Sequence, residues 1–288
     1  MRFFTVTALA LMIFTTSAFA EDILEKIERT GTVNMGFREG SRPFGYINSA
    51  GEWVGFGIDL GQEIVNALET RFNKPIRLVK KPMNPKTRIP LVVNGTVDMG
   101  IGSTTITLAR EEVVDFSLPY FLTGSRLLVP ADSSIKSFED LAGKRVGMGS
   151  GSTANIKGID LAMESGIIKP ACSKVLFEEH NKGFLGLQQG KIHAYFTDES
   201  QLAGMVVTAK DPKAWKIVGN YLTYEPYGLI LPENQGEWRD FVNQALIHTI
   251  KSGRFEEIYT QWFGPSSDVP LPMSQEYKTL LKALSYPE

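Results

Sequence analysis

Cysteine and an excess of charge of either sign are both lacking in this 288-residue chain. The one cysteine, Cys172, excludes an internal disulfide framework, and we expect it to be structural because no histidine accompanies it in the sequence. Lys and Arg total 30 against 32 Asp and Glu, a formal net charge of −2. This balance offers no electrostatic attraction to nucleic acid or an anionic membrane, so neither partner is expected. No metal or cofactor is expected either.

Long apolar runs are lacking too, except at the N-terminus. A basic start and an apolar run at residues 3–14 precede Ala18-Phe19-Ala20, the small-residue pattern of a signal peptidase site. Residues 1–20 are therefore predicted to be a signal peptide, because the run is short for a membrane span; an N-terminal anchor helix is the alternative. Without Arg2, 29 basic and 32 acidic residues remain (29 − 32 = −3), and no nearby cysteine encodes a lipid anchor.

The rest of the chain alternates predicted strands with predicted helices. Strands are expected at residues 32–37, 76–81, 97–101, 145–148, 174–177 and 194–197, and helices at 59–72, 88–94, 154–163, 183–189, 200–207, 237–252, 255–262 and 274–284. This alternation, with 43% hydrophobic and 10% aromatic residues, predicts an α/β protein with two domains of ordinary size.

Two extended segments, at residues 126–130 and 221–231, lie on either side of a second series of alternating strands and helices. We therefore expect the second domain to be inserted into the first: residues 21–128 and 225–288 form lobe 1, and residues 129–224 form lobe 2. The two segments would make a two-stranded hinge, with a central ligand cleft between the lobes. Two sequential domains with one linker are the alternative, although no Gly-, Ser- and Pro-rich linker is visible.

One stretch, Asp98–Arg110, combines features of an anion site. An alternating apolar strand leads into the polar turn Gly102–Thr105, and Thr107 can cap a short helix that carries Arg110 in its first turn. Backbone amides, hydroxyls and a guanidinium would then meet, and a guanidinium fork matches the two oxygens of a carboxylate. The alternative is an ordinary strand-to-helix turn with Arg110 in solvent.

Several motifs occur along the chain in a characteristic order: Gly55–Leu60, Asn94–Asp98, Thr105–Arg110, Asp115–Tyr120, Asp140–Gly147 and Gly183–Gly190. Together they resemble the polar amino acid solute-binding proteins of ABC importers, family 3, across residues 31–285. Arg38-Glu39 and the turn Gly102–Thr105 resemble the glutamate/aspartate-binding branch. The resemblance implies a two-lobed, type II periplasmic binding protein fold. It also implies a periplasmic monomer that captures an amino acid and delivers it to a membrane permease.

The resemblance implies that Arg110 binds the ligand α-carboxylate and Asp198 the ligand ammonium. Further contacts would come from two polar turns, one with Ser103, Thr104 and Thr105 and one with Ser150, Ser152 and Thr153. The chemistry agrees, because small residues let the backbone approach and a helix N-terminus favours an anion. As a nucleotide loop, the second turn lacks the Gly-Lys-Ser/Thr of a P-loop. For Asp198 a helix N-cap is the alternative, and Glu199 is assigned to solvent.

At the distal end of the ligand, the resemblance implies Arg38, Arg88 and His180 around a second carboxylate. The alternatives are a surface charge, a helix-start cation and a solvated loop histidine. A first-turn arginine opposes the helix dipole, which favours a function for Arg88. Pro85 departs from the branch, which has a hydroxyl residue there. The predicted ligand is therefore glutamate, aspartate or a related acidic amino acid, with a different polar amino acid as the alternative.

Aromatic residues are candidates for lids over the aliphatic part of the ligand. Of Phe44, Tyr46, Phe121 and Tyr227, we expect Phe44 to line the cleft, with core packing as the alternative for any of them.

Two other functions are alternatives to ligand capture. A cyclohexadienyl or arogenate dehydratase-like enzyme on the same fold needs a general acid or base, for which Glu39, Glu178 and Glu179 are the candidates. A sensor domain usually has a tethered kinase or membrane span, and the sequence shows neither. We therefore predict a binding protein rather than an enzyme.

Overall fold

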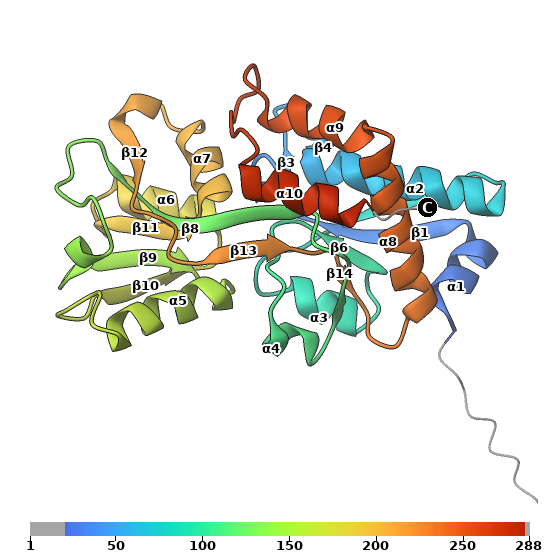
Figure 1. Ribbon diagram of the computed structural model, residues 1–288, viewed down its shortest axis with the longest axis horizontal. Coiled ribbons are helices and arrows are strands. Elements are labelled where there is room, and N and C mark those ends of the chain that lie inside the picture. Colours follow the sequence, from blue (N-terminus) through green and yellow to red (C-terminus); the bar gives the residue numbers. More distant parts are fainter. Residues whose placement is uncertain (1–20, 286–288) are drawn as a thin grey trace, which may run out of the picture.

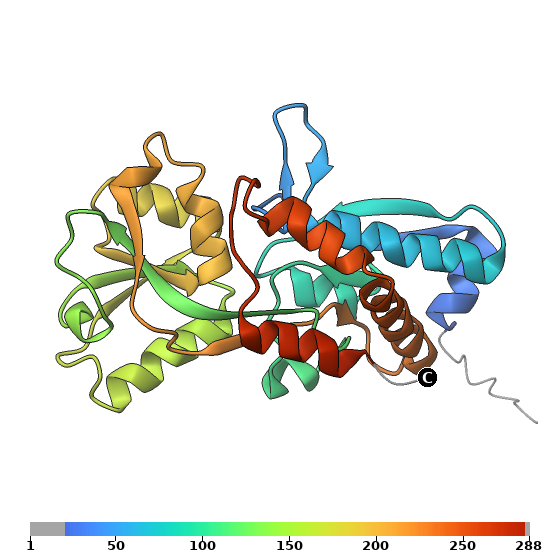
Figure 2. The ribbon, with the colours of Figure 1, turned by 45° about the horizontal axis from the view of Figure 1, so that its top comes forward.

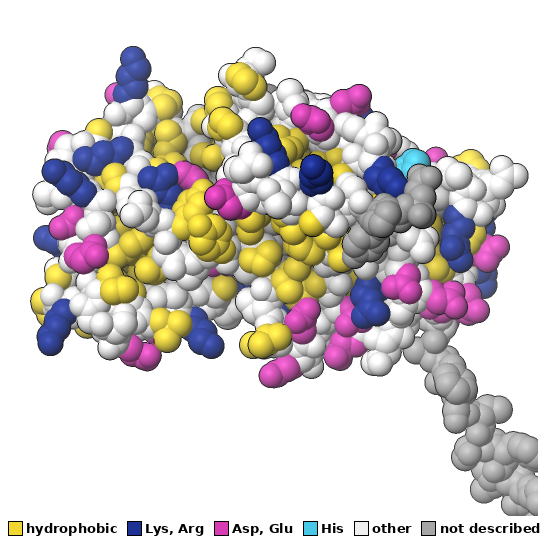
Figure 3. Space-filling view, viewed as in Figure 1, with side chains coloured by type: hydrophobic (Ala, Val, Ile, Leu, Met, Phe, Trp, Pro, Cys, Tyr) yellow, Lys and Arg dark blue, Asp and Glu magenta, His cyan; other side chains and the backbone are white. Residues whose placement is uncertain are grey.

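The computed structural model describes residues 21–285, so the predicted signal peptide at residues 1–20 lies outside the described residues. The chain forms two lobes, each built on a sheet with helices packed against it (Figures 1 and 2). The long strand β8 (Phe121–Pro130) runs from one lobe into the other. Charges of both signs are interspersed on the face shown in Figure 3.

Lobe 1 contains a five-stranded sheet in the order β5-β1-β6-β14-β7. Its strands are β5 (Arg77–Pro82), β1 (Thr32–Phe37), β6 (Met99–Ile101), β14 (Ile230–Leu231) and β7 (Asp115–Phe116). β1 is parallel to both β5 and β6, whereas β14 is antiparallel to its neighbours. Helices α2 (Phe56–Phe72) and α3 (Arg88–Val93) lie on opposite sides of this sheet (Figure 1).

Helices from the C-terminal part of the chain complete lobe 1. They are α8 (Gly236–Lys251), α9 (Arg254–Phe263) and α10 (Gln275–Leu284). α8 and α9 pack on α2, and the Tyr277 hydroxyl donates to the Tyr120 carbonyl at 2.8 Å to fix α10. A small antiparallel sheet is formed by β2 (Gly40–Ser41), β3 (Gly45–Ile47) and β4 (Trp53–Val54).

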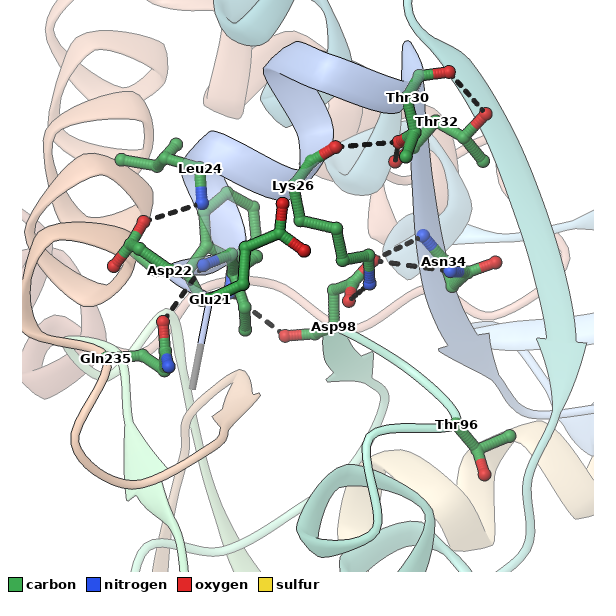
Figure 4. A network of polar contacts seen from close by, with 12 residues as sticks. Glu21, Asp22, Leu24, Lys26, Thr30, Thr32, Asn34, Thr96, Asp98 and Gln235 are labelled. Carbon is green, nitrogen blue, oxygen red and sulfur yellow. Dashed lines mark hydrogen bonds and ion pairs between the residues drawn. The ribbon is translucent and has the colours of Figure 1, made fainter. Parts of the chain in front are cut away.

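Helix α1 (Ile23–Thr30) was not expected from the sequence, although its charged and apolar residues alternate with a helical period. It is held by an ion pair between Lys26 and Asp98, and the Asp98 carboxylate also accepts the backbone N–H of Asn34 at 2.8 Å (Figure 4). The start of the chain is thereby attached to the strand that leads into the polar turn Gly102–Thr105.

Lobe 2 contains the sheet β10-β9-β11-β8-β12. Its strands are β10 (Ser173–Phe177), β9 (Arg145–Gly149), β11 (Ala194–Asp198), the second half of β8, and β12 (Trp215–Val218), which the sequence analysis missed. Helices α5 (Thr153–Glu164), α6 (His180–Gln188) and α7 (Glu199–Val206) pack around it, with short 3-10 turns at Glu139–Leu141 and Pro212–Ala214. Cys172 is buried and free, with Sγ 3.7 Å from Met163 Sδ.

The connection between the lobes lies a few residues from its predicted place. The first half of β8 pairs antiparallel with β13 (Tyr224–Tyr227), from Phe121 opposite Tyr227 to Gly124 opposite Tyr224. The predicted hinge segment at residues 126–130 instead pairs with β11 and β12, inside the lobe 2 sheet. Its apolar alternation suited a sheet as well as a linker, and strand partners cannot be read from one strand alone. The lobe limits at residues 128/129 and 224/225 stay a prediction.

Within residues 21–285, no helix combines the length and apolarity needed to cross a membrane.

Candidate ligand-binding site

The polar turn after β6 has the expected local structure. Thr107 caps the short helix α4 (Leu108–Glu111), its hydroxyl accepting the backbone N–H of Arg110. The Arg110 guanidinium, 8% exposed, points back and donates to the Thr105 carbonyl at 2.5 Å. It also donates to Thr153 Oγ1 of lobe 2 at 3.1 Å. Arg110 is therefore not a solvated surface cation.

The turn after β9 brings the second lobe against the first. A Cβ at Gly151 would lie 2.4 Å from the carbonyl oxygen of Pro85, so only glycine permits this approach. Ser152 is buried, Thr153 begins α5 and is largely exposed, and the buried Ser150 Oγ has no hydrogen-bond partner among the described residues. Both predicted turns thus face one another across the cleft.

Arg88 is a buried cation whose hydrogen-bond acceptors are all neutral. It is 4% exposed, and Nη1 donates to the Ser103 carbonyl at 2.7 Å and to Thr104 Oγ1 at 3.0 Å. Its Nη2 reaches the Gly151 carbonyl at 3.4 Å, and its Nε has no partner within the described chain. Burial, with Arg110 and Arg38 nearby, places the pKa of Arg88 well below its usual value. A guanidinium with only neutral acceptors at this depth is costly unless an anion joins it.

Arg38 and His180 lie close enough to Arg88 to interact with it electrostatically. Arg38 is 2% exposed and donates from Nη2 to Glu179 Oε2 at 3.1 Å, across the lobes. His180 begins α6 and is buried, with Nδ1 3.1 Å from the Tyr195 hydroxyl, so it is not the solvated loop histidine of the alternative. Burial, and then Arg38 and Arg88, lower the pKa of His180 to about 3. The ring is neutral near pH 7 and acts as a neutral donor or acceptor.

Asp198 ends β11 and is buried at the cleft floor. It occupies the N-cap position of α7, but its side chain does not cap the helix. Instead the carboxylate accepts from Asn155 Nδ2 at 2.8 Å, from Ser125 Oγ at 3.3 Å and from the Tyr227 hydroxyl. Asp198 is therefore the N-cap residue of α7 without a side-chain cap hydrogen bond, and its carboxylate is held by neutral donors instead.

Glu199, assigned to solvent, does not face it. Its carboxylate pairs with Arg126 and accepts the Tyr221 hydroxyl, and its side chain is 16% exposed. The adjacent acidic residues thus have separate partners, because a strand-to-helix junction sends consecutive side chains in different directions.

One buried carboxyl group, that of Glu225 in β13, was not predicted from the sequence. It is 1% exposed and accepts from Thr105 Oγ1 at 2.5 Å, Thr223 Oγ1 at 2.6 Å and Ser125 Oγ at 3.3 Å. Burial and the nearby Asp198 carboxylate raise its pKa. The strand period of two was the available signal, because it puts Glu225 and Tyr227 on one face of the extended segment.

Phe44, expected to line the cleft, is placed in the core of lobe 1. Its ring lies 4.9 Å from Phe121, 5.5 Å from Tyr227 and 5.5 Å from Phe263, in edge-on contacts. It supports Tyr227, which holds Asp198, from behind the cleft. Core packing was the alternative for this residue, and its contact with a ligand stays a prediction.

The lobes also touch at the rim of the cleft. Ser41 Oγ donates to Gln201 Oε1 at 2.7 Å, and a Cβ at Gly204 would lie 1.9 Å from the Arg42 carbonyl oxygen. Two rim cavities of about 250 and 500 Å³ flank these contacts, and Glu39 and Asn181 line both. No group of three or more His, Cys, Asp or Glu in residues 21–285 is arranged to hold a metal.

The protein thus has two lobes, which are joined by paired strands and bury charged side chains between them. This arrangement defines a two-lobed ligand-binding protein. The family model for bacterial extracellular solute-binding proteins, family 3, matches residues 33–265, and the chain belongs to this family. It is 32% identical to the L-glutamate/L-aspartate-binding protein of Pseudomonas aeruginosa, covering 96% of this chain and 93% of the relative. It is 35% identical to the glutamate/aspartate import solute-binding protein of Salmonella typhimurium, covering 92% and 87%.

Solved structures agree with this assignment. An ancestral arginine-binding protein bound to glutamine has a TM-score of 0.72 at 34% identity, covering 81% of this chain and 98% of that one. An ancestral amino acid-binding protein described as a precursor of cyclohexadienyl dehydratase has a TM-score of 0.71 at 28% identity, covering 84% and 100%. The predicted two-lobed, type II fold and the predicted class of transport solute-binding protein, rather than enzyme, are confirmed.

Proposed function

We propose that this protein captures an acidic amino acid, glutamate or aspartate, for an ABC importer. The charge pattern of the site carries the proposal. Within residues 21–285, Arg88 and Arg110 contact only neutral acceptors, and Asp198 contacts only neutral donors. A ligand with two carboxylates and one ammonium supplies a partner to each of these three groups.

Each ligand group then has a place. The α-carboxylate binds Arg110, with the turns of Ser103, Thr104 and Thr105 and of Ser150, Ser152 and Thr153 around it. The ammonium binds Asp198. The distal carboxylate binds Arg88, whose Nε lacks a partner within the described chain, with Arg38 and His180 beside it. Closure of the lobes removes these ions from water, so each charge needs its counterpart.

A ligand of different charge leaves part of this pattern unsatisfied. Glutamine has the same shape as glutamate but offers Arg88 no anion, and arginine adds a cation next to Arg88 and Arg38. The two bacterial relatives, both named glutamate- and aspartate-binding proteins, support an acidic ligand. Pro85 closes against Gly151 and offers no hydroxyl to the distal carboxylate.

The proposed function also specifies where the protein acts and which partner it meets. Its family is extracellular, and we propose a periplasmic, monomeric carrier that docks its closed form on a membrane permease and binds no nucleic acid. The general acid-base candidates for a dehydratase are engaged or exposed: Glu178 pairs with Lys182, Glu179 pairs with Arg38, and Glu39 lies exposed at the rim.

Titration calorimetry against the individual amino acids tests the ligand class. We expect L-glutamate or L-aspartate to bind more tightly than glutamine and asparagine by roughly a hundredfold, because an unpaired buried charge costs on the order of 3 kcal/mol. A neutral or basic amino acid that binds more tightly than both acidic ones contradicts the proposal.

A further inference from the structure

Glu225 lies directly behind the turn that is proposed to hold the ligand. Strand β13 borders this turn, because Thr105 forms a β-bridge with Tyr227 and the Ile106 N–H donates to the Pro226 carbonyl at 2.8 Å. The Glu225 carboxyl group is thus fixed to the hinge, one side-chain length from the ligand loop. Nothing in the ligand assignment above uses it.

The contact between Glu225 and Thr105 fixes the direction of a hydroxyl. A threonine hydroxyl has one hydrogen and two lone pairs. With Thr105 Oγ1 2.5 Å from Glu225 Oε2, the hydrogen goes to the carboxylate when Glu225 is ionised, as it is in the ligand-bound form described below, since an ionised carboxylate can only accept. The lone pairs of Thr105 are then left for a donor. Of the ligand groups proposed above, only the ammonium donates.

Ser125 links Glu225 to Asp198. Its Oγ lies 3.3 Å from Glu225 Oε1 and 3.3 Å from Asp198 Oδ1, and it accepts from Asn155 Nδ2 at 2.8 Å. The cleft floor therefore holds two buried carboxyl groups within one hydrogen-bond network. An α-amino acid brings one cation to this floor.

We infer that Glu225 is a positioning and specificity-determining residue for the ligand ammonium: it holds Thr105 Oγ1 as an acceptor and adds a second negative charge behind Asp198. The inference rests on the proposed function. It makes the site demand an α-ammonium, so that diacids lacking the amino group are rejected even though they satisfy both arginines.

In this role, Glu225 changes its protonation state when the ligand binds. The titratable groups that face Glu225 include Asp198 from β11, Arg110 from α4 and the Tyr227 hydroxyl from its own strand, and burial with the Asp198 carboxylate raises the pKa of Glu225. An arriving ammonium favours the ionised form and lowers that pKa again. Glu225 therefore releases a proton when the amino acid binds at a pH at or below the raised pKa. A residue that only packs the hinge would release none.

The test compares L-glutamate with glutarate, which has the same two carboxylates and no amino group, in wild type and Glu225→Gln. We expect Glu225→Gln to lower the preference for L-glutamate over glutarate by roughly tenfold to a hundredfold, because hydrogen bonds to a charged group contribute about 1.5–3 kcal/mol. Calorimetry in buffers of different ionisation enthalpy should show proton release with L-glutamate in wild type and less in Glu225→Gln.

Further variants separate the possible failures. Thr105→Val deletes the hydroxyl at the other end of the contact and should lower the same preference, whereas Thr105→Ser should keep it. Glu199→Gln, at a carboxylate of α7 that pairs with Arg126, is the matched control and should change neither quantity. An unchanged preference in both Glu225→Gln and Thr105→Val, with unchanged proton release, overturns the inference. A wild-type protein that does not bind L-glutamate overturns the proposed function itself.

Discussion

Arg110 of lobe 1 donates from Nη2 to Thr153 Oγ1 of lobe 2 at 3.1 Å. The guanidinium proposed to bind the α-carboxylate is therefore itself a contact between the lobes. Because the same side chain also reaches the Thr105 carbonyl, ligand binding and closure of the cleft share one group.

Arg110→Ala should abolish useful binding of every amino acid. The substitution leaves the ligand α-carboxylate buried without its cation, a cost on the order of 3–5 kcal/mol, or roughly two to three and a half powers of ten in affinity. Calorimetry with L-glutamate measures the loss. Arg239→Ala removes an exposed guanidinium on α8 that pairs with Asp115 at 3.6 Å, and it should bind as wild type does. Affinity for Arg110→Ala within a few-fold of wild type would remove Arg110 from the site.

Gly204→Ala should hinder closure of the cleft without unfolding either lobe. The added Cβ would lie 1.9 Å from the Arg42 carbonyl oxygen across the rim, and a backbone atom yields only if the lobes separate. We expect weaker L-glutamate binding and a larger radius of gyration by small-angle scattering at saturating ligand. Gly236→Ala is the control, because its Cβ would meet nothing within 4 Å. A ligand-bound Gly204→Ala protein as compact as wild type would show that this contact does not limit closure.

His180 should make the folded protein less stable as the pH falls. Its pKa is lowered to about 3 by burial and then by Arg38 and Arg88. Below about pH 6.5 the unfolded chain binds a proton that the folded chain does not, which removes about 1.4 kcal/mol of unfolding free energy per pH unit until the folded pKa is reached. Denaturant unfolding of wild type and His180→Gln from pH 7 to 5 should show a steeper loss in wild type. Parallel curves would mean that His180 titrates normally in the fold.

Local patterns in the sequence were sufficient for much of the fold. The strand at Thr32–Phe37 and the helix cap at Thr107 match their predictions, because apolar period and capping chemistry act within a few residues. The hinge was displaced because strand pairing joins residues about a hundred positions apart, as in Phe121 opposite Tyr227. No local pattern encodes that register.

The candidate site, like the fold, was predicted from the sequence only in part. The sequence and its resemblance named the charged residues that the structure brings together, including Arg88, Arg110 and Asp198. It did not reveal Glu225, whose importance comes from burial and from Thr105, 120 positions away. Nor did it indicate the lowered pKa of His180, since that lowering depends on burial and on two arginines that only the fold places beside it.

If Arg88 is buried to meet a second carboxylate of the ligand, the affinity ratio of L-glutamate to L-glutamine depends on its charge. Calorimetry should give a ratio of roughly a hundred or more in wild type. In Arg88→Gln, which removes the charge, L-glutamate should weaken by about that factor while L-glutamine changes by less than about tenfold, so the preference collapses. Arg239→Gln should leave the ratio unchanged. A protein in which Arg88→Gln weakens both ligands equally, with the ratio intact, contradicts the claim.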